Sequence, residues 1–375
     1  MRIAMLVSLA VSWSREAALR LSELGHEVHA IDFESEVTGN YLRGRNDLYG
    51  DSIGKLEENL AGIHIIRGHD ISQFRYLRYA PQLRKICKEI QGDVLLSLWG
   101  GGFAMISCVS GIRPYAVFLG GGDVLRVSGI QKTLSRFALD RAAITFANGQ
   151  YFGERAKAFA PRAAIHPIYL GVDPSRFTPG EPPASPVVIL CTRGFSHVYN
   201  NGYVIEALSL LPASIPDFRV VFTSAGELLE ETQALADRIL SPEVRQRVSF
   251  LNGVTDEGML ENLQNAHIYT SLSRYDGTSI SLLEALSCGL FPILSDIPQN
   301  REWIDPHVRN GMLVPLDQPA TYAQRLEEAI RNRAHRNSMG PFNRRLILER
   351  ADGRKTMAQV ASLLESAIGS RNSKN

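Results

Sequence analysis

Short apolar runs alternate with helical patterns along this chain, and the alternation occurs twice. At the N-terminus, residues 2–8 read as a buried strand, residues 14–24 as a helix that Gly25 ends, and residues 27–32 as a second strand. A strand, a helix and a strand in this order form a βαβ unit with parallel strands. Further strands are expected at 93–99 and 115–119 and, in a second series, at 187–192, 219–223, 248–251, 267–272 and 291–294, with helices at 203–211 and 281–286. The chain is therefore predicted to be an α/β protein with two doubly wound domains.

A proline-rich segment separates the two series. Residues 166–186, HPIYLGVDPSRFTPGEPPASP, contain six prolines and several turn signals, as interdomain linkers do. We place the first domain at 1–166, the linker at 167–186 and the second domain at 187–350, with a charged amphipathic tail from about 341 onward. The length of 375 residues suits two domains of this size.

Charge and cysteine content exclude several classes of protein. The formal net charge of +1 creates no global field that would attract nucleic acid. No apolar stretch approaches the length of a membrane span, and Arg15, Glu16 and Arg20 interrupt the N-terminal run that resembles a signal peptide. Scattered cysteines without a CxxC pair favour buried, reduced thiols over disulfides or zinc, and they stand at Cys87, Cys108, Cys191 and Cys288. We predict a soluble cytoplasmic protein, at most peripheral at the cytoplasmic face of the membrane.

Two glycine triplets follow predicted strands of the first domain, at 100–102 and 120–122. Glycine lets the backbone approach a ligand closely, and open α/β sheets bind ligands at the carboxyl ends of their strands. Each triplet could equally be a tight turn. Their equivalent positions favour a binding site.

The most informative stretch is SRYDGTSISLLEALSCGLFPILSD, at 273–296. A polar loop ends at Asp276 and Gly277, and Thr278 or Ser279 can cap a helix that begins there. The free N–H groups and the positive end of such a helix form a seat for phosphate. Glu284 is set among leucines on the same helix, where a ligand hydroxyl pair such as that of ribose would offset its burial. The alternative is a capping Asp276 and a solvent-facing Glu284.

This stretch resembles the donor-binding region of glycosyltransferase family 4, whose signature is two acidic residues with seven between them. Asp276 and Glu284 match it, although the family's first residue is usually Glu, one methylene longer. The resemblance spans nearly the whole chain and also rests on SELGHEVHAI at 22–31, GVDPSRF at 171–177, TRGFSHVYNNGYVIEAL at 192–208 and SDIPQNREWI at 295–304.

The resemblance implies the GT-B fold, in which two Rossmann-like domains face a central cleft and the C-terminal helix, here 355–372, packs back on the first domain. It implies a nucleoside-diphosphate sugar as donor substrate, with no cofactor. In the site that it implies, Asp276 contacts the donor sugar, the N–H groups of Gly277, Thr278 and Ser279 hold phosphate, Glu284 binds the ribose, and Arg193 neutralises the diphosphate leaving group. For Arg193 the alternative is a surface arginine after a strand.

The chain departs from the family at a phosphate-binding lysine that normally follows the arginine. That place falls on Tyr199 and Asn200, and no lysine occurs between Lys157 and Lys355. The predicted phosphate clamp therefore uses Arg193, backbone and neutral donors, with Arg274 and Arg301 as candidate helpers. Arginine binds phosphate bidentately where lysine acts as a point charge, so the geometry changes more than the charge.

In the first domain, the residues 120–123 stand where relatives often have a His-Gly-x-Asp turn, so the histidine is missing. The resemblance makes Gly121, Gly122 and Asp123 candidates for sugar or acceptor contact, while Asp123 could equally cap a helix at Val124. Trp99 is a weaker candidate and could be core. The segment 67–88 is basic and carries interleaved aromatic residues, which would suit an interfacial helix at anionic lipids or a solvated charged face.

The function expected from these residues is that of a retaining glycosyltransferase, which moves a sugar to an acceptor hydroxyl of a glycan, a lipid-linked sugar or a small glycoside. The alternatives are a GT-B-like sugar-nucleotide epimerase and a sugar-nucleotide-binding protein with a decayed site. A nicotinamide dehydrogenase is disfavoured, because the first strand is not followed by GxGxxG. HExxH, DxD and Cys/His clusters are absent from the sequence, so no metal site is expected.

Overall fold

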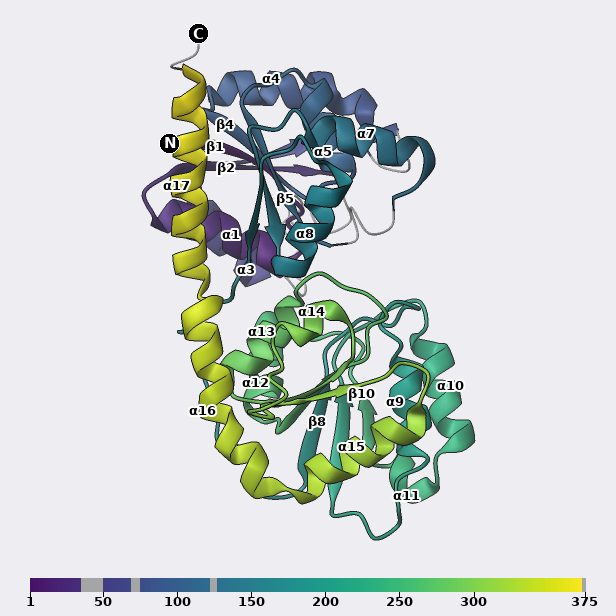
Figure 1. Ribbon diagram of the computed structural model, residues 1–375. Helices are drawn as coiled ribbons and strands as arrows, with labels where there is room; N and C mark the ends of the chain where they lie inside the picture. The colour runs from purple at the N-terminus through teal and green to yellow at the C-terminus, as the bar shows by residue number, and fades with distance from the viewer. Residues whose placement is uncertain (35–49, 69–74, 122–126, 373–375) are drawn as a thin grey trace. The chain divides into compact units, whose positions relative to one another are not determined.

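The computed structural model describes residues 1–34, 50–68, 75–121 and 127–372, and it divides into two compact units (Figure 1). The first unit contains Met1–Leu170 together with Gly353–Asn375, and the second contains Gly171–Asp352. Each unit has its own parallel sheet and its own hydrophobic core.

The first unit is built on a seven-stranded sheet in the order β3-β2-β1-β4-β5-β6-β7, with all strands parallel. Its strands are β1 Arg2–Leu6, β2 Glu27–Phe33, β3 Gly62–Ile66, β4 Val94–Leu98, β5 Tyr115–Leu119, β6 Ile144–Asn148 and β7 Ile165–Ile168. Its described helices are α1 Ser12–Glu23, α3 Gly50–Asn59, the 3₁₀ helix η1 Arg75–Tyr79, α4 Ala80–Ile90, α5 Gly102–Val109, α7 Gly129–Leu139, α8 Gln150–Phe159 and α17 Gly353–Asn372.

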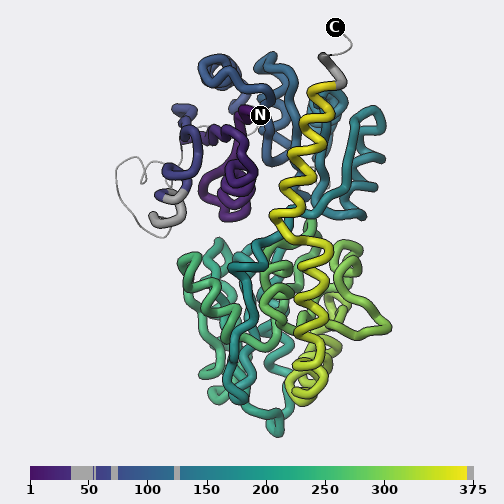
Figure 2. The backbone as a smooth tube through the Cα atoms, turned by 90° about the vertical axis from the view of Figure 1, so that its left-hand side faces the viewer, coloured from purple at the N-terminus to yellow at the C-terminus, as the bar shows by residue number. Residues whose placement is uncertain are grey.

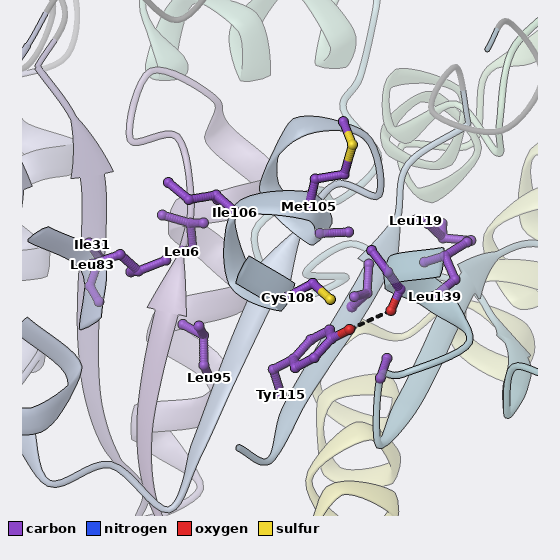
Figure 3. Close-up of a cluster of buried hydrophobic side chains, with 14 of the residues drawn as sticks. Leu6, Ile31, Leu83, Leu95, Met105, Ile106, Cys108, Tyr115, Leu119 and Leu139 are labelled. Atoms are coloured by element: carbon purple, nitrogen blue, oxygen red, sulfur yellow. Dashed lines mark hydrogen bonds between the residues drawn. The ribbon is translucent and has the colours of Figure 1, made fainter. Parts of the chain in front are cut away.

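The central strands of this sheet are apolar and buried because helices cover both of its faces. Figure 3 shows part of the resulting core, where Leu6, Leu95 and Met105 lie among side chains from strands and helices. Tyr115 is fully buried, and its hydroxyl donates to the carbonyl of Ala138 at the end of α7. A buried hydroxyl needs such a partner, and this bond fixes α7 to the sheet.

The second unit is built on a six-stranded parallel sheet in the order β10-β9-β8-β11-β12-β13. Its strands are β8 Val187–Cys191, β9 Phe218–Phe222, β10 Val248–Phe250, β11 Ile268–Ser271, β12 Phe291–Ser295 and β13 Met312–Val314. Its helices are α9 Asn201–Leu208, α10 Leu229–Ile239, α11 Pro242–Arg245, α12 Asp256–Gln264, α13 Ile280–Ser287, α14 Pro298–Arg301, α15 Pro319–Arg331 and α16 Arg333–Arg350.

The two predicted α/β alternations are confirmed, and the strands lie within a residue or two of their expected positions. The proline-rich segment differs in detail from the expected linker, because β7 includes Pro167 and Ile168 as an edge strand paired with β6. A proline is tolerated at an edge, where its missing N–H costs no central ladder bond. Pro341, where the charged tail was expected to begin, lies inside α16.

The last helix, α17, belongs to the first unit although it follows the second in sequence. It packs against α1 and β6. Figure 2 shows it in yellow, directly after α16. Met357, Val360 and Leu364 form its buried side. No helix of the described part of the chain combines the length and the apolar character that crossing a membrane requires.

Candidate functional site

The candidate residues of the second unit lie at the carboxyl ends of neighbouring strands. Arg193 follows β8 by two residues, and the loop with Asp276 leads from β11 into α13. Ser279 is the N-cap of α13, and its hydroxyl accepts a hydrogen bond from the N–H of Leu282, as expected. The carboxyl edge of an open parallel sheet is where such folds bind ligands, so both segments are placed for binding.

The guanidinium of Arg193 joins these two segments. Its Nη2 donates to Oδ2 of Asp276 at 2.6 Å, and its Nη1 donates to Oγ of Ser279 at 2.9 Å and to Oγ of Ser281 at 3.2 Å. The side chain of Arg193 is only 13% exposed, which rules out the alternative of a solvated surface arginine. A buried cation requires such partners.

Tyr199, which stands at the place of the family's lysine, and two residues that the sequence did not suggest complete the surroundings of Arg193. The ring of Tyr199 lies over the guanidinium, with 4.1 Å between Cζ and the ring centroid. The buried Tyr269 of β11 pairs its hydroxyl with Oγ of Ser281 at 2.9 Å. Asn201 braces the loop, because its Nδ2 donates to the carbonyls of Arg193 and Gly194 at 3.2 and 3.1 Å. Ser281 accepts from Arg193 and contacts Tyr269, and its place two residues after the cap Ser279 is a feature of the sequence that could have pointed to these contacts.

Burial and charge act against each other at the Arg193–Asp276 pair. Burial lowers the pKa of Arg193, but the Asp276 carboxylate and nearby groups prevail and hold this pKa above its usual value. Burial raises the pKa of Asp276, while Arg193 and the N–H of Gly277 oppose that rise. The guanidinium of Arg193 therefore stays charged. The carboxyl group of Asp276 is largely shielded from solvent and lies next to this positive charge.

Asp276 is fixed at three atoms. Its Oδ2 accepts from Arg193, its Oδ1 accepts from the N–H of Gly277 at 2.9 Å, and its carbonyl accepts from Nε2 of Gln299 at 2.7 Å. Gln299 comes from α14, so a third segment contributes to the site. The interpretation of Asp276 as a helix cap does not hold, since Ser279 fills that role.

Glu284 lies on α13, partly buried between the fully buried Leu283 and Ala285. Its charge contributes to raising the pKa of Arg193, so it belongs to the same electrostatic environment. Thr278 and Ser279 are also buried, and with Gly277 they form the turn that enters the helix. The turn and Arg193 thus lie at the N-terminus of α13, and Glu284 follows on the same helix, close enough for its charge to act on Arg193.

The candidate helpers are engaged elsewhere. Arg301 holds Asp296 with both arms of its guanidinium, at 2.6 and 3.0 Å, so its bidentate edge is filled. Arg274 is exposed and reaches Oδ1 of Asn200 at 3.3 Å and Oδ1 of Asp317 at 3.5 Å. Of the two residues at the place of the family's lysine, Tyr199 contacts Arg193 and Asn200 contacts Arg274.

The first-unit candidates are less completely placed. Gly122 and Asp123 lie outside the described residues, and Gly121 adopts φ of +145°, which favours glycine. Trp99 has φ of +99° at the end of β4, and its ring lies 4.8 Å from that of Trp13. A bulky residue with this backbone is strained, and such strain clusters at functional sites.

The first glycine triplet has a packing reason at one position. A Cβ on Gly102 would lie 3.1 Å from the ring of Tyr76, so glycine at the start of α5 admits that buried tyrosine. Packing against Tyr76 therefore accounts for glycine at position 102 without a ligand.

The described part of the basic segment 67–88 corrects the expectation of an interfacial helix. Tyr76 and Tyr79 are buried in the core with the apolar side of α4, and residues 69–74 lie outside the described residues. Arg84, Lys85 and Lys88 are exposed. Tyr76 and Tyr79 are therefore not available for insertion into lipid, whereas the exposed cations of α4 remain free to meet an anionic surface.

Within the described ranges, no group of three or more His, Cys, Asp or Glu side chains is placed to hold a metal ion. The four cysteines are free and buried.

Comparison with solved structures defines the class of the fold. The structure of HepE from Anabaena in complex with UDP and glucose superposes with a TM-score of 0.79 over 98% of this chain and 100% of that one, at 15% identity. Sucrose-phosphate synthase from Thermosynechococcus elongatus superposes with a TM-score of 0.80 over 99% and 100%, at 13% identity. The chain has the GT-B fold, as the sequence predicted.

Comparison of sequences then defines the family. Residues 174–346 match the family described as glycosyl transferases group 1. A GDP-mannose:cellobiosyl-diphosphopolyprenol alpha-mannosyltransferase of Xanthomonas oryzae is 30% identical over 173 residues, 44% of this chain and 44% of that protein. The chain thus aligns with less than half the length of this relative. The match to the group 1 glycosyltransferases lies within the second unit and confirms the resemblance found in the sequence.

Proposed function

We propose that the protein is a retaining glycosyltransferase that moves a sugar from a nucleoside-diphosphate sugar to an acceptor hydroxyl. The observation that carries the proposal is the placement of Arg193 and the turn at Gly277–Ser279 at the N-terminus of α13, with Glu284 further along the same helix. A buried guanidinium beside the positive end of a helix suits a diphosphate, and a carboxylate one turn along suits a ribose.

The proposed catalysis is electrostatic. Negative charge develops on the diphosphate as the glycosidic bond breaks, and a guanidinium fixed before the reaction stabilises that charge without reorganisation. In the retaining mechanism that we propose, the departing phosphate takes the proton of the acceptor hydroxyl, so no separate protein base is needed. The diphosphate is held by Arg193 and backbone N–H groups, and we therefore propose that the reaction is independent of added metal.

The relatives indicate which donor to test first. The Xanthomonas relative uses GDP-mannose by name, and so does a phosphatidylinositol monomannoside mannosyltransferase of Corynebacterium glutamicum, which is 25% identical over 71% of this chain and 74% of that protein. We propose GDP-mannose as the first donor and a lipid-linked sugar as the acceptor class. Contact with an anionic membrane surface would then use the exposed cations of 67–88, such as Arg84 and Lys88.

The test is release of nucleoside diphosphate from a panel of GDP, UDP and ADP sugars, with and without acceptor glycosides and with EDTA present. We expect release that requires acceptor, and a loss of about 10²-fold or more in kcat for Arg193→Lys, which keeps the charge but not the bidentate fork. Conversion of the donor without acceptor would instead identify an epimerase, and binding without turnover would identify a decayed site.

A further inference from the structure

The carboxylate of Asp276 accepts hydrogen bonds from two of the groups that the proposed function assigns to the donor phosphate. Its Oδ2 accepts from Nη2 of Arg193 at 2.6 Å and its Oδ1 accepts from the N–H of Gly277 at 2.9 Å. These two donors are the guanidinium and the first N–H group of the proposed phosphate seat. The carboxylate of Asp276 therefore fills part of the proposed phosphate site.

Arg193 has few donors left for a ligand. Nη1 serves Ser279 and Ser281, and Nη2 serves Asp276. Nε is buried and has no hydrogen-bond partner among the described residues. A guanidinium has five N–H groups in a planar fork, so the accessible part of this fork is largely the part that Asp276 holds. Tyr199 covers a face of the guanidinium, so a ligand must approach its edge.

The backbone at Asp276 is anchored independently of its carboxylate. Nε2 of Gln299 donates to the carbonyl of Asp276 at 2.7 Å, and Ser279 caps α13 three residues later. The side chain can therefore leave Arg193 by rotation about its own bonds while the turn keeps its shape. Such a rotation exchanges one charge-assisted partner of Arg193 for another, so the buried cation is never left alone.

We propose that Asp276 is a displaceable stand-in for the donor diphosphate: the diphosphate takes Arg193 and the Gly277 N–H from it, and the released carboxylate turns to the hydroxyls of the donor sugar. Diphosphate recognition and sugar recognition are coupled through one side chain. A shorter acid than the family's usual glutamate suits this role, because its carboxylate is held within reach of the N–H of Gly277. The inference rests on the proposed function, since it concerns the same donor site.

The test measures the binding of inorganic pyrophosphate by calorimetry, because pyrophosphate has neither a ribose nor a sugar. If Asp276 competes for the site, Asp276→Asn should bind pyrophosphate about tenfold or more tightly than the natural chain. Asp276→Ser is the second variant, and thermal melting confirms that each is folded. An equal or weaker affinity in the folded variants would mean that Asp276 supports Arg193 rather than competing for it, and would overturn the inference.

The control removes a carboxylate that does not bond Arg193. Glu284→Gln lowers the negative charge around Arg193 by the same amount, and we expect its affinity for pyrophosphate to stay within about threefold of the natural value. A gain equal to that of Asp276→Asn would show a general charge effect and would overturn the stand-in role. The proposed function is tested separately by GDP and UDP: failure of the natural chain to bind either contradicts that function, whereas binding without a gain in Asp276→Asn contradicts only this inference.

Discussion

In the function that we propose, Arg193 alone takes the task that the family resemblance assigns to an arginine and a lysine. The second unit contains no lysine. Of the two candidate helpers, Arg301 is paired with Asp296, and the exposed Arg274 is paired with Asp317. The chain surrounds Arg193 with neutral oxygens, one carboxylate and an aromatic ring instead. Its orientation, and not only its charge, is therefore under the control of its neighbours.

Tyr199 should position Arg193 through its ring. A cation over an aromatic face gains about 0.5 to 2 kcal/mol, and the ring also fixes the plane of the guanidinium. We expect Tyr199→Leu to weaken GDP or UDP binding by about 3- to 30-fold and Tyr199→Phe to leave it within about twofold, as measured by calorimetry. Equal losses in both variants would assign the effect to the hydroxyl instead.

Asp32 predicts a pH dependence of stability. It is buried on β2, accepts from the N–H groups of Leu9 and Phe33 at 2.7 Å each, and burial raises its pKa from 3.8 to about 6. The unfolded chain loses this proton near pH 4 and the folded chain near pH 6, so the contribution of Asp32 to stability falls as pH rises between these values. The total is at most about 3 kcal/mol.

The measurement for Asp32 is the free energy of unfolding of the natural chain and of Asp32→Asn from pH 4 to 7.5. We expect the free energy of unfolding of the natural chain to fall relative to that of Asp32→Asn as pH rises from 4 to 6. Above pH 7 the difference between the two free energies should stay constant. A difference that grows in favour of the natural chain over this range would mean that the two N–H donors outweigh burial.

Sequence patterns located the charged candidates but not their contacts. Arg193, Asp276 and Glu284 stand in a recognisable spacing, and the structure brings Arg193 and Asp276 together. Tyr199 could not be assigned, because its contact with Arg193 depends on the path of an irregular loop. The left-handed backbone of Trp99 is equally invisible in a sequence, since tertiary packing sets it.

At the scale of elements, α13 carries the site and other elements hold it in place. Its N-terminus is capped by Ser279, and its C-terminus is tied to the proline-rich segment because Oγ of Ser287 donates to the carbonyl of Phe177 at 2.6 Å. The elements that the sequence missed, such as β7 and β13, are short edge strands with little hydrophobic signal. The interior strands β1, β4 and β5 were found because burial on both faces makes them continuous apolar runs, whereas the interior strand β6, whose sequence ITFAN includes polar residues, was missed.

Arg344 of α16 should be a main contributor to this fixation. Its Nη1 donates to the carbonyls of Phe177 and Ser287 at 2.9 and 2.8 Å, and its Nη2 donates to the carbonyl of Pro174 at 2.9 Å. We expect Arg344→Ala to lower the free energy of unfolding of the second unit by about 2 to 4 kcal/mol, because charge-assisted bonds to otherwise buried carbonyls are lost. Urea unfolding followed by the fluorescence of Trp303 measures this.

The matched control for Arg344 is its neighbour Arg345, which is exposed. Arg345→Ala should cost no more than about 0.5 kcal/mol, as surface substitutions do. A similar cost for both variants would attribute the effect to helix propensity or net charge rather than to the three carbonyl bonds.

At the scale of the whole molecule, the chain leaves the first unit at Leu170 and returns to it at Gly353, so the first unit is discontinuous in sequence. The second unit is an uninterrupted segment that contains the matched family region and Trp303. Trp13 and Trp99 lie in the first unit. The tryptophans therefore report on the two units separately once those of one unit are replaced by phenylalanine.

Ending the chain at Asp352 should destabilise the first unit alone. The truncation removes α17 and exposes the side of α1 against which it packs. Met357, Val360 and Leu364 of α17 are buried in the intact chain. Each such side chain contributes about 1.5 to 3 kcal/mol through burial, so the loss is a large part of the stability of a domain. We expect the thermal transition reported by Trp13 and Trp99 to move to lower temperature or to vanish, while that of Trp303 stays within about 2 °C.

A chain that ends at Asn372 is the control for this truncation, and its two thermal transitions should match those of the natural chain. If the Trp303 transition falls together with the other, the two units unfold as one cooperative body, and α17 stabilises both.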